Sequence, residues 1–211
     1  MQFNDPLLMP LTGETPQQRL DKSISLLNTP GQQYVEKRGI TIDIAHSAGV
    51  RFDPDWNGRA AVLFPMMDNN GNLCSLHGRY LEQAGDQNKM FTIGAGGGMV
   101  ILGNALHSDP IIIVEGLFDA LSLLVCGFSA LATVGRRAPW LPNVCNGKKV
   151  FLAFDATRSG EADTAYYKDY LKDSFTKRML PPYNKKDWNS ALTKKGAVLV
   201  EDWISRNIRL A

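Results

Sequence analysis

The sequence has few of the residues that build zinc sites or disulfide frameworks. It contains three cysteines and three histidines in 211 residues. Cys74, Cys126 and Cys145 stand far apart and show no metal-ligand spacing, which argues against a zinc ribbon. Cys74 and Cys126 lie within apolar stretches, so we interpret them as small buried side chains in a reducing compartment.

The chain also lacks an apolar run long enough to span a bilayer, and no basic region followed by an apolar core opens it. These absences predict a cytoplasmic protein without a membrane partner. The net charge is only +2, so any argument for nucleic-acid binding has to come from local clusters of charge. With 44% apolar and 21% charged residues, the composition is that of a soluble globular protein with one large or two small domains.

What the sequence does contain is two buried-strand patterns that each end in an acid. Residues 111–114 are Ile-Ile-Ile-Val and precede Glu115, and residues 150–154 are Val-Phe-Leu-Ala-Phe and precede Asp155. Unbroken apolar runs of this length are typical of parallel strands that are buried on both faces. Ligands of open α/β sheets bind beyond the carboxyl ends of the strands, where these two acids are expected to lie.

The first half of the chain predicts short helices followed by antiparallel strands. Residues 1–14 show no periodicity and are interpreted as a flexible tail. A change of period near Val50 marks the start of the strands, and Asn69-Asn70-Gly71 is a hairpin turn. The predicted helices span residues 15–28, 31–38 and 42–47, and the predicted strands span residues 59–67, 72–81 and 89–93.

The strand over residues 72–81 has a polar face. Ser75, His77 and Arg79 alternate with apolar residues and form a partly cationic outer row, for which a solvated sheet face remains an alternative. The glycine run at residues 94–98 lacks the strand, helix and lysine of a phosphate loop, so a flexible connector is favoured over a phosphate site. Residues 99–102 are expected to pair back onto the first sheet.

The second half alternates strand and helix, which predicts a parallel sheet with right-handed crossovers. The expected strands are residues 111–114, 129–133, 150–154 and 176–180, and the expected helices are residues 117–126, 161–174 and 187–208 with a break at Gly196.

Four acids are expected to meet at the carboxyl ends of these strands. Asp119 lies one helical turn after Glu115, and Asp187 joins Asp155 after the last strand. Converging carboxylates bind a hard divalent cation such as Mg²⁺ well. Helix-dipole stabilisation remains an alternative for Asp119, and helix capping for Asp187.

These residues resemble a known family. Glu115-Gly116-x-x-Asp119, then Asp155 with Arg158 and Gly160, then Asp187, are similar in order and spacing to the TOPRIM domain of primases, topoisomerases and some nucleases. Upstream, the chain is similar to the N-terminal subdomain of the bacterial replicative primase core. The residues that carry this second likeness are Tyr34 to Ile40, Phe64-Pro65, Asp68-x-x-Gly71, His77-Gly78-Arg79 and Lys89.

The resemblance covers roughly residues 20–200 and implies an α/β protein of two subdomains. Residues 15–105 would form a mixed α+β primase-core subdomain, and residues 106–211 a TOPRIM parallel-sheet subdomain with C-terminal helices. Lys-Asp-Trp-Asn at residues 186–189 resembles plasmid and phage members. The implied activity is synthesis of short RNA primers on single-stranded DNA from ribonucleoside triphosphates, with Mg²⁺ or Mn²⁺.

The resemblance also implies roles for individual residues. Glu115 and Asp155 would be catalytic, and Asp119, Asp155 and Asp187 would hold the metal. Basic groups recognise phosphate through charge and directed hydrogen bonds. The residues expected to contact nucleic acid or nucleotide are His77, Arg79, Lys89, Arg136, Arg137, Arg158, Lys185 and Lys186; solvated loop charges are the alternative for the lysine and arginine pairs among them.

The sequence departs from the family in two ways. Thr157 stands where the family has a second aspartate, and either Glu161 or Asp163 is a candidate to replace the missing charge. The zinc-binding module and the helicase segment of bacterial-type primases are not found in this sequence, so we expect a helicase or a separate zinc-binding module as partners. A TOPRIM module that has lost catalysis, or a TOPRIM nuclease, remains an alternative, and a topoisomerase is disfavoured.

Overall fold

The structure is a computed structural model that describes residues 13–82 and 88–210. The tail that we predict over residues 1–14 therefore lies outside the described residues, except for Gly13 and Glu14. Within the described ranges, every helix is too short or too polar to cross a membrane.

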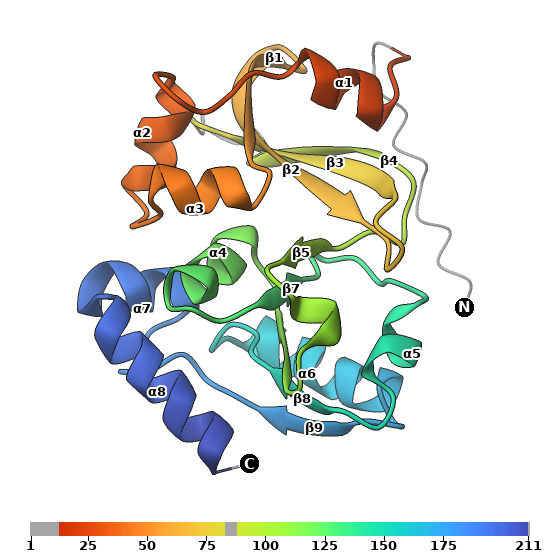
Figure 1. The fold of residues 1–211 in the computed structure, drawn as a ribbon, viewed down its shortest axis with the longest axis vertical. Coiled ribbons are helices and arrows are strands. Elements are labelled where there is room, and N and C mark those ends of the chain that lie inside the picture. The colour runs from red at the N-terminus through yellow and green to blue at the C-terminus, as the bar shows by residue number, and fades with distance from the viewer. Residues whose placement is uncertain (1–12, 83–87, 211) are drawn as a thin grey trace.

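Two sheets lie one above the other (Figure 1). The first has four antiparallel strands in the order β1-β2-β3-β4, and the second has five in the order β5-β7-β6-β8-β9. In the second sheet only β5 is antiparallel to its neighbour. The strands are β1 (Arg51–Trp56), β2 (Arg59–Met67), β3 (Leu73–Tyr80), β4 (Met90–Gly94), β5 (Val100–Leu102), β6 (Ile111–Val114), β7 (Ala130–Ala132), β8 (Lys149–Leu152) and β9 (Phe175–Arg178).

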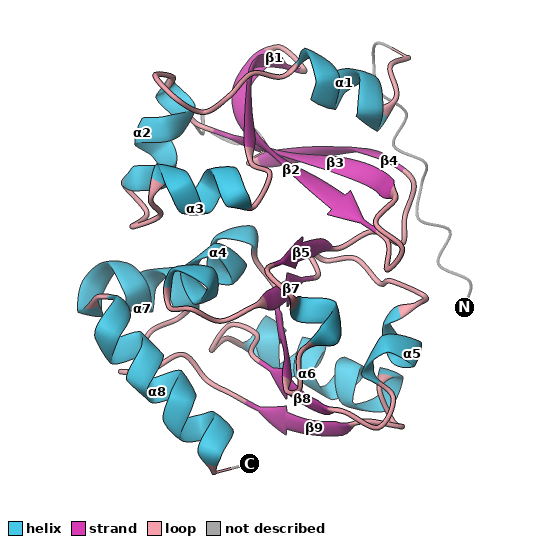
Figure 2. Cartoon of the chain, viewed as in Figure 1, coloured by secondary structure: helices cyan, strands magenta, loops and turns pink. Residues whose placement is uncertain are grey.

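Helices surround both sheets, as Figure 2 shows. They are α1 (Pro16–Lys22), α2 (Pro30–Glu36), α3 (Ile42–Ser47), α4 (Leu117–Val125), α5 (Leu141–Cys145), α6 (Arg158–Tyr170), α7 (Trp188–Lys195) and α8 (Ala197–Arg209), with a short 3-10 turn at Ala105–His107. This arrangement confirms the predicted fold class, a mixed α+β first part followed by a mostly parallel α/β sheet.

Alternation along β6 divides the core of the second sheet. Ile112 and Val114 face α4, α7 and α8, whereas Ile111 and Ile113 pack in a separate cluster with residues of α5 and α6. Burial on both faces explains why this strand has no polar residue before Glu115. The parallel sheet is therefore covered on both sides, and its strand ends are left to form a site.

The core on the α4 side continues into the first sheet. Val62 and Phe64 of β2 belong to the same buried cluster as Ile112 and Val114. The ring of Phe118 lies 5.8 Å from that of Phe64, in an edge-to-face arrangement. One hydrophobic core thus fixes the two sheets relative to each other.

The structure corrects the predicted first helix. Residues 15–28 were expected to be helical, but α1 ends at Lys22. Ser23 is extended and its hydroxyl donates to the carbonyl of Leu20, which ends the helix. Ile24 then pairs with Phe52 of β1, a strand that the sequence did not predict. Tertiary pairing thus overrides the apolar spacing that favoured a longer helix.

Two further expectations about the first sheet were wrong. Ser75 and His77 do not lie on a solvated outer face; they are 0% and 2% exposed because the second half of the chain covers this side of β3. Residues 99–102 do not return to the first sheet as a strand. Met99 makes one bridge to Met67, and β5 then pairs with β7 in the second sheet.

The glycine run after β4 has a packing role. A Cβ atom on Gly98 would lie 2.8 Å from the carbonyl oxygen of Met66, and one on Gly94 would lie 2.5 Å from that of Cys74. The backbone passes so close to β2 and β3 that larger residues are excluded. Packing thus accounts for Gly94 and Gly98, and the positive φ of 92° favours glycine at position 97.

Candidate functional site

A cavity of about 410 Å³ lies where the carboxyl ends of the parallel strands face the first sheet. Residues of both sheets and of the helix ends between them form its walls. The lining residues are Arg38, His77, Arg79, Met90, Glu115, Gly116, Leu117, Phe118, Asp119, Val134, Gly135, Asp155, Lys186, Asp187 and Asn189. The four acids that the sequence predicted to converge are all among them.

Glu115 and Asp119 enter the cavity from β6 and α4. Glu115 directly follows the strand, and Asp119 lies in the first turn of α4, almost fully buried. A Cβ atom on Gly116 would lie 2.4 Å from Oδ2 of Asp119, so glycine makes room for this carboxylate. Oδ1 of Asp119 accepts a hydrogen bond of 3.0 Å from the backbone N–H of Asn189, at the start of α7.

Asp155 and Asp187 complete the acidic wall. Asp155 follows β8 and lines the cavity. Asp187 is the N-cap of α7, where Oδ1 accepts a 2.6 Å hydrogen bond from the N–H of Ser190. The capping role that we considered for Asp187 is therefore present, and the residue lines the cavity as well.

Burial and mutual repulsion make these carboxyl groups hard to ionise. The pKa of Asp119 rises to about 8, mainly through burial and then through the charge of Asp155. The pKa of Glu115 is also raised, first by burial and then by Asp155 and Asp163, while Lys186 lowers it. Burial and Asp187 raise the pKa of Asp155, against Lys186 and Arg178. A bound cation would offset this repulsion.

The donor chemistry fits a hard divalent cation in part. Among residues 13–82 and 88–210, no three His, Cys, Asp or Glu side chains stand close enough together to hold one ion. Mg²⁺ in nucleotide-binding sites takes only one or two protein carboxylates and completes its shell with water and substrate phosphate. Carboxylates on one cavity wall satisfy that smaller demand, and the assignment of Asp119, Asp155 and Asp187 as metal ligands stays a prediction.

Thr157 is the N-cap of α6. Its hydroxyl accepts a hydrogen bond of 3.1 Å from the N–H of Gly160. Of the two acids considered as replacements for its missing charge, Glu161 pairs with Arg178 at 2.8 Å. Asp163 raises the pKa of both Glu115 and Asp155, so its charge acts at the site. Neither acid lines the cavity, so the replacement of the missing charge stays a prediction.

The first half of the chain contributes His77, Arg79 and Arg38 to the cavity, and we call these three residues the basic wall. The hydroxyl of Tyr34 accepts from Nη2 of Arg38 at 3.0 Å and from Nε of Arg79 at 3.4 Å, which joins the two guanidinium groups. His77 contacts the hydroxyl of Thr92 through Nδ1 at 2.7 Å. Burial, Arg136 and Arg79 lower the pKa of His77 to about 3, so His77 is uncharged near neutral pH.

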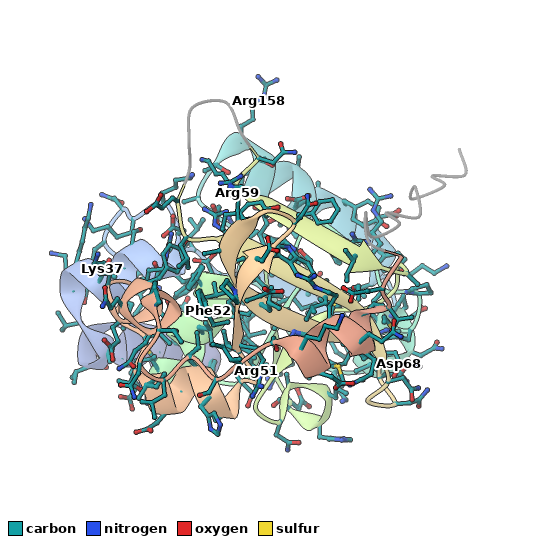
Figure 3. All side chains as sticks on the ribbon, turned by 90° about the horizontal axis from the view of Figure 1, so that it is seen from above. Lys37, Arg51, Phe52, Arg59, Asp68 and Arg158 are labelled. Carbon is teal, nitrogen blue, oxygen red and sulfur yellow. The ribbon has the colours of Figure 1, made fainter. Side chains whose placement is uncertain are left out.

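The remaining predicted basic residues have different positions. Lys186 lines the cavity, whereas Lys89, Lys185 and Arg158 do not. Lys89 and Arg158 are exposed, and Arg158 projects outward from the edge of the fold in Figure 3. Their assignment as nucleic-acid contacts stays a prediction.

Arg136 and Arg137 lie on the loop after β7. Three tyrosines of α6 contact this loop. The hydroxyl of Tyr167 donates to the carbonyl of Arg136 at 2.9 Å, and that of Tyr170 donates to the carbonyl of Ala138 at 3.0 Å. The guanidinium of Arg137 lies 3.8 Å from the centre of the Tyr166 ring. The same loop begins with Val134 at φ 50°, a strained value for a β-branched residue, and Val134 lines the cavity.

The sequence did not identify Arg38 and Asn189 as site residues. Asn189 donates through Nδ2 to the carbonyl of Arg38 at 2.8 Å and to the hydroxyl of Ser122 at 3.0 Å. The guanidinium of Arg38 lies 4.2 Å from the centre of the Phe118 ring. Both residues stand in segments that carry the family likeness, which was the signal available to find them.

Comparison with known proteins agrees with this geometry. Residues 112–192 match the family described as Toprim-like. This stretch contains β6, the four acids and most of α7. The match covers less than half of the chain and agrees with the predicted resemblance to the TOPRIM domain.

The similar proteins are DNA primases. Sixty residues are 48% identical to the DNA primase DnaG of Methanococcus vannielii, a match over 28% of this chain and 14% of that protein. The zinc-binding and RNA polymerase domains of the Aquifex aeolicus primase superpose with a TM-score of 0.72 at 18% identity, over 90% of this chain and 59% of that one. The RNA polymerase domain of the Mycobacterium tuberculosis primase gives 0.73 at 14%, over 90% and 81%. The chain thus has the fold of a bacterial primase catalytic core.

Proposed function

We propose that the chain synthesises short RNA primers on single-stranded DNA from ribonucleoside triphosphates, with Mg²⁺ or Mn²⁺. The observation that carries this proposal is one cavity lined by Glu115 and Asp155 from the second half of the chain and by Arg38 and Arg79 from the first. A DnaG primase catalytic domain bound to single-stranded DNA has the same fold, with a TM-score of 0.67 at 19% identity over 90% of this chain and 77% of that one.

The acidic wall has the chemistry that phosphoryl transfer requires. When bound, a divalent cation neutralises the triphosphate and the departing pyrophosphate. The 3′-hydroxyl of one nucleotide attacks the α-phosphorus of the next, the bond to pyrophosphate breaks, and Glu115 accepts the hydroxyl proton. Its raised pKa brings this carboxylate closer to the working pH, which favours a general base. Asp119, Asp155 and Asp187 would hold the cation.

The basic residues would bind phosphates. Arg38, Arg79 and Lys186 face the cavity and would contact the triphosphate or the nearest template phosphate. The uncharged His77 would contribute a hydrogen bond. Outside the cavity, the residues that would follow the template backbone are Lys89, Arg136, Arg137, Arg158 and Lys185.

A helicase and a separate zinc-binding module are the protein partners that we propose, in the cytoplasm. The primase fragment of the bacteriophage T7 primase-helicase protein has a related fold, with a TM-score of 0.59 at 16% identity over 86% of this chain and 80% of that one.

Primer synthesis on single-stranded DNA tests the proposal. Labelled ribonucleotides are supplied with Mg²⁺ or Mn²⁺, and products are resolved by length. Glu115→Gln and Asp155→Asn are expected to lower the rate by about 100-fold or more, because each removes a charge at the reacting phosphate. The control is Asp169→Asn, which changes an exposed acid further along α6 and should leave the rate unchanged.

A second candidate is a Toprim-like module that binds nucleic acid without extending a primer, and Thr157 in place of an acid favours it. Thr157→Asp keeps a capping oxygen for Gly160 and adds the charge. If wild type, Glu115→Gln and Thr157→Asp are all inert while DNA still binds, primer synthesis is refuted and the second candidate stands. Shortening of the labelled template would instead identify a nuclease.

A further inference from the structure

The segment that carries Asp155 is held by a strand on one side only. The N–H of Ala153 donates to the carbonyl of Ile113 at the end of β6 at 2.8 Å, whereas pairing with β9 stops before Asp155. The parallel pairing of β8 with β9 ends at Leu152 and Arg178, and a last hydrogen bond of 3.1 Å runs from the N–H of Met179 to the carbonyl of Leu152. Residues 153–155 continue beyond this point toward the cavity. Their carbonyl groups need other donors to keep the backbone fixed.

Arg178 supplies those donors. Its Nη1 donates to the carbonyls of Leu152, Phe154 and Met179 at 3.1, 2.8 and 3.0 Å. Its Nη2 donates to the carbonyl of Asp155 at 2.8 Å. One side chain thereby binds the backbone on both sides of Phe154 and at the acid itself.

Glu161 fixes the guanidinium from the other side. Its Oε1 accepts from Nε of Arg178 at 3.1 Å and from Nη2 at 2.8 Å. The side chain of Arg178 is only 15% exposed, whereas that of Glu161 is 58% exposed. A planar fork of donors suits this arrangement, and a lysine ammonium cannot reproduce it.

Other groups complete the support of the same segment. The indole N–H of Trp188 donates to the carbonyl of Ala153 at 2.7 Å, and the N–H of Ala156 donates to the carbonyl of Lys186 at 2.7 Å. A Cβ atom on Gly160 would lie 2.0 Å from the carbonyl oxygen of Asp155. The Asp155 segment is thus held by β6, β9, α6 and α7, and Arg178 binds two carbonyls within it, those of Phe154 and Asp155, and two beside it, those of Leu152 and Met179.

We propose that Arg178 is a positioning residue that fixes the carboxylate of Asp155 for a divalent cation. This inference rests on the proposed function, because it assigns Asp155 to the metal. Arg178 acts through the backbone of residues 152–155, behind the carboxylate. Outer-sphere residues of this kind change metal affinity by about 10- to 100-fold when they are replaced.

Charge and geometry predict opposite effects, which makes the proposal testable. If Arg178 acted only through its charge, its removal would strengthen cation binding, because a positive charge near Asp155 repels a cation. If Arg178 acts by positioning, both Arg178→Ala and Arg178→Lys weaken binding, since neither can hold the carbonyls of Phe154 and Asp155 together. The Lys variant keeps the charge and so isolates the geometry.

The experiment measures Mn²⁺ affinity of the full chain by electron paramagnetic resonance, without nucleotide or DNA. We expect Arg178→Ala and Arg178→Lys to weaken Mn²⁺ binding by about 10-fold or more. Millimolar guanidinium should restore affinity to Arg178→Ala, whereas sodium chloride at the same concentration should not. Lys177→Met removes the exposed lysine next to Arg178 on β9 and is the matched control with unchanged affinity.

The outcomes separate the positioning role of Arg178 from the proposed metal-dependent function. Unchanged or tighter binding in both Arg178 variants overturns the positioning role while leaving the proposed function standing. If wild type binds no Mn²⁺ either alone or with a ribonucleoside triphosphate present, the metal-dependent function fails, and the positioning role fails with it. Circular dichroism checks folding, and if Arg178→Ala does not fold, the Lys variant alone decides.

Discussion

At the scale of single residues, burial changes what a side chain can do in the site. His77 alternates with apolar residues along β3, and by pattern alone it is a polar surface residue. In the structure it is 2% exposed and faces the charges of Arg79 and Arg136. The imidazole therefore stays neutral and acts as a hydrogen-bonding group, whereas Arg79 and Arg38 supply the positive charge of that wall.

His77 should make the stability of the protein depend on pH. Its pKa is about 3 in the folded state against 6.5 for an ordinary histidine, so the unfolded chain binds the proton first. The contribution of neutral His77 to the free energy of unfolding is fully present above pH 6.5. It is lost as the pH falls toward 3, by up to about 1.4 kcal/mol per pH unit. Urea unfolding between pH 7 and pH 5 measures this slope.

The matched variants separate His77 from the other titrating groups. His77→Asn keeps a polar atom for Thr92 and should flatten the slope, while His46→Asn, at an exposed position of α3, should not change it. Equal slopes in wild type and His77→Asn would mean that the buried imidazole takes up its proton without unfolding.

Some residues of the site could be predicted from the sequence and others could not. Glu115 and Asp155 were predicted at the site because an apolar strand pattern fixes which residue ends the strand. Arg38 and Asn189 were missed, since they reach the cavity only through contacts between α2, α4 and α7 that no local pattern encodes. Arg178 carries no signal in the sequence, because its contacts with Phe154 and Asp155 arise only once β8 and β9 are paired.

At the scale of elements, the parallel half was easier to predict than the antiparallel half. An apolar run such as residues 111–114 predicts a strand inside a parallel sheet, because both faces of the strand must be covered. Short helices depend on tertiary partners, and α1 ends early because residue 24 pairs with β1 instead. The alternation along β3 was predicted, with Leu76 and Tyr80 on one face and His77 and Arg79 on the other. Burial of the second face depends on the other half of the chain, which the strand itself does not specify.

Helix α6 should control how well the loop after β7 binds nucleic acid. Two hydroxyl groups of this helix, on Tyr167 and Tyr170, hold the backbone of Arg136 and Ala138. The double variant Tyr167→Phe with Tyr170→Phe should weaken binding to single-stranded DNA and make it less salt-dependent, by about one phosphate contact. Fluorescence anisotropy at several salt concentrations measures the slope.

The loop prediction has its own control. Tyr166→Phe keeps the aromatic ring under the guanidinium of Arg137 and should leave the slope as in wild type. Loss of the two hydroxyl–carbonyl bonds should also lower stability by about 1–3 kcal/mol. If stability falls but the salt slope is unchanged, the tyrosines support the fold alone and the loop does not bind phosphate.

At the scale of the whole molecule, the cavity exists because two sheets share one core. The acids belong to the second sheet and its helices, and His77 and Arg79 belong to the first. Phe118 of α4 links the halves through its contacts with Tyr34 and Phe64, with ring centres 5.7 and 5.8 Å away. Relative movement of the halves would separate the basic wall from the acidic wall.

The shared core predicts that both halves unfold in one transition. Trp56 is buried in the first sheet, 2% exposed, and Trp188 is fully buried beside the acids, so each reports on one half. We expect the native ¹⁹F signals of both residues to disappear at the same urea concentration in protein labelled with 5-fluorotryptophan, because Val62, Phe64, Ile112 and Val114 lose their common packing together. Replacement of Phe118 by alanine opens a hole in this contact and should lower the midpoint for both signals, with a loss of about 3–5 kcal/mol. Separate midpoints for Trp56 and Trp188 in the wild-type protein would show that the halves are independent, and the cavity would then need a ligand to hold its two walls together.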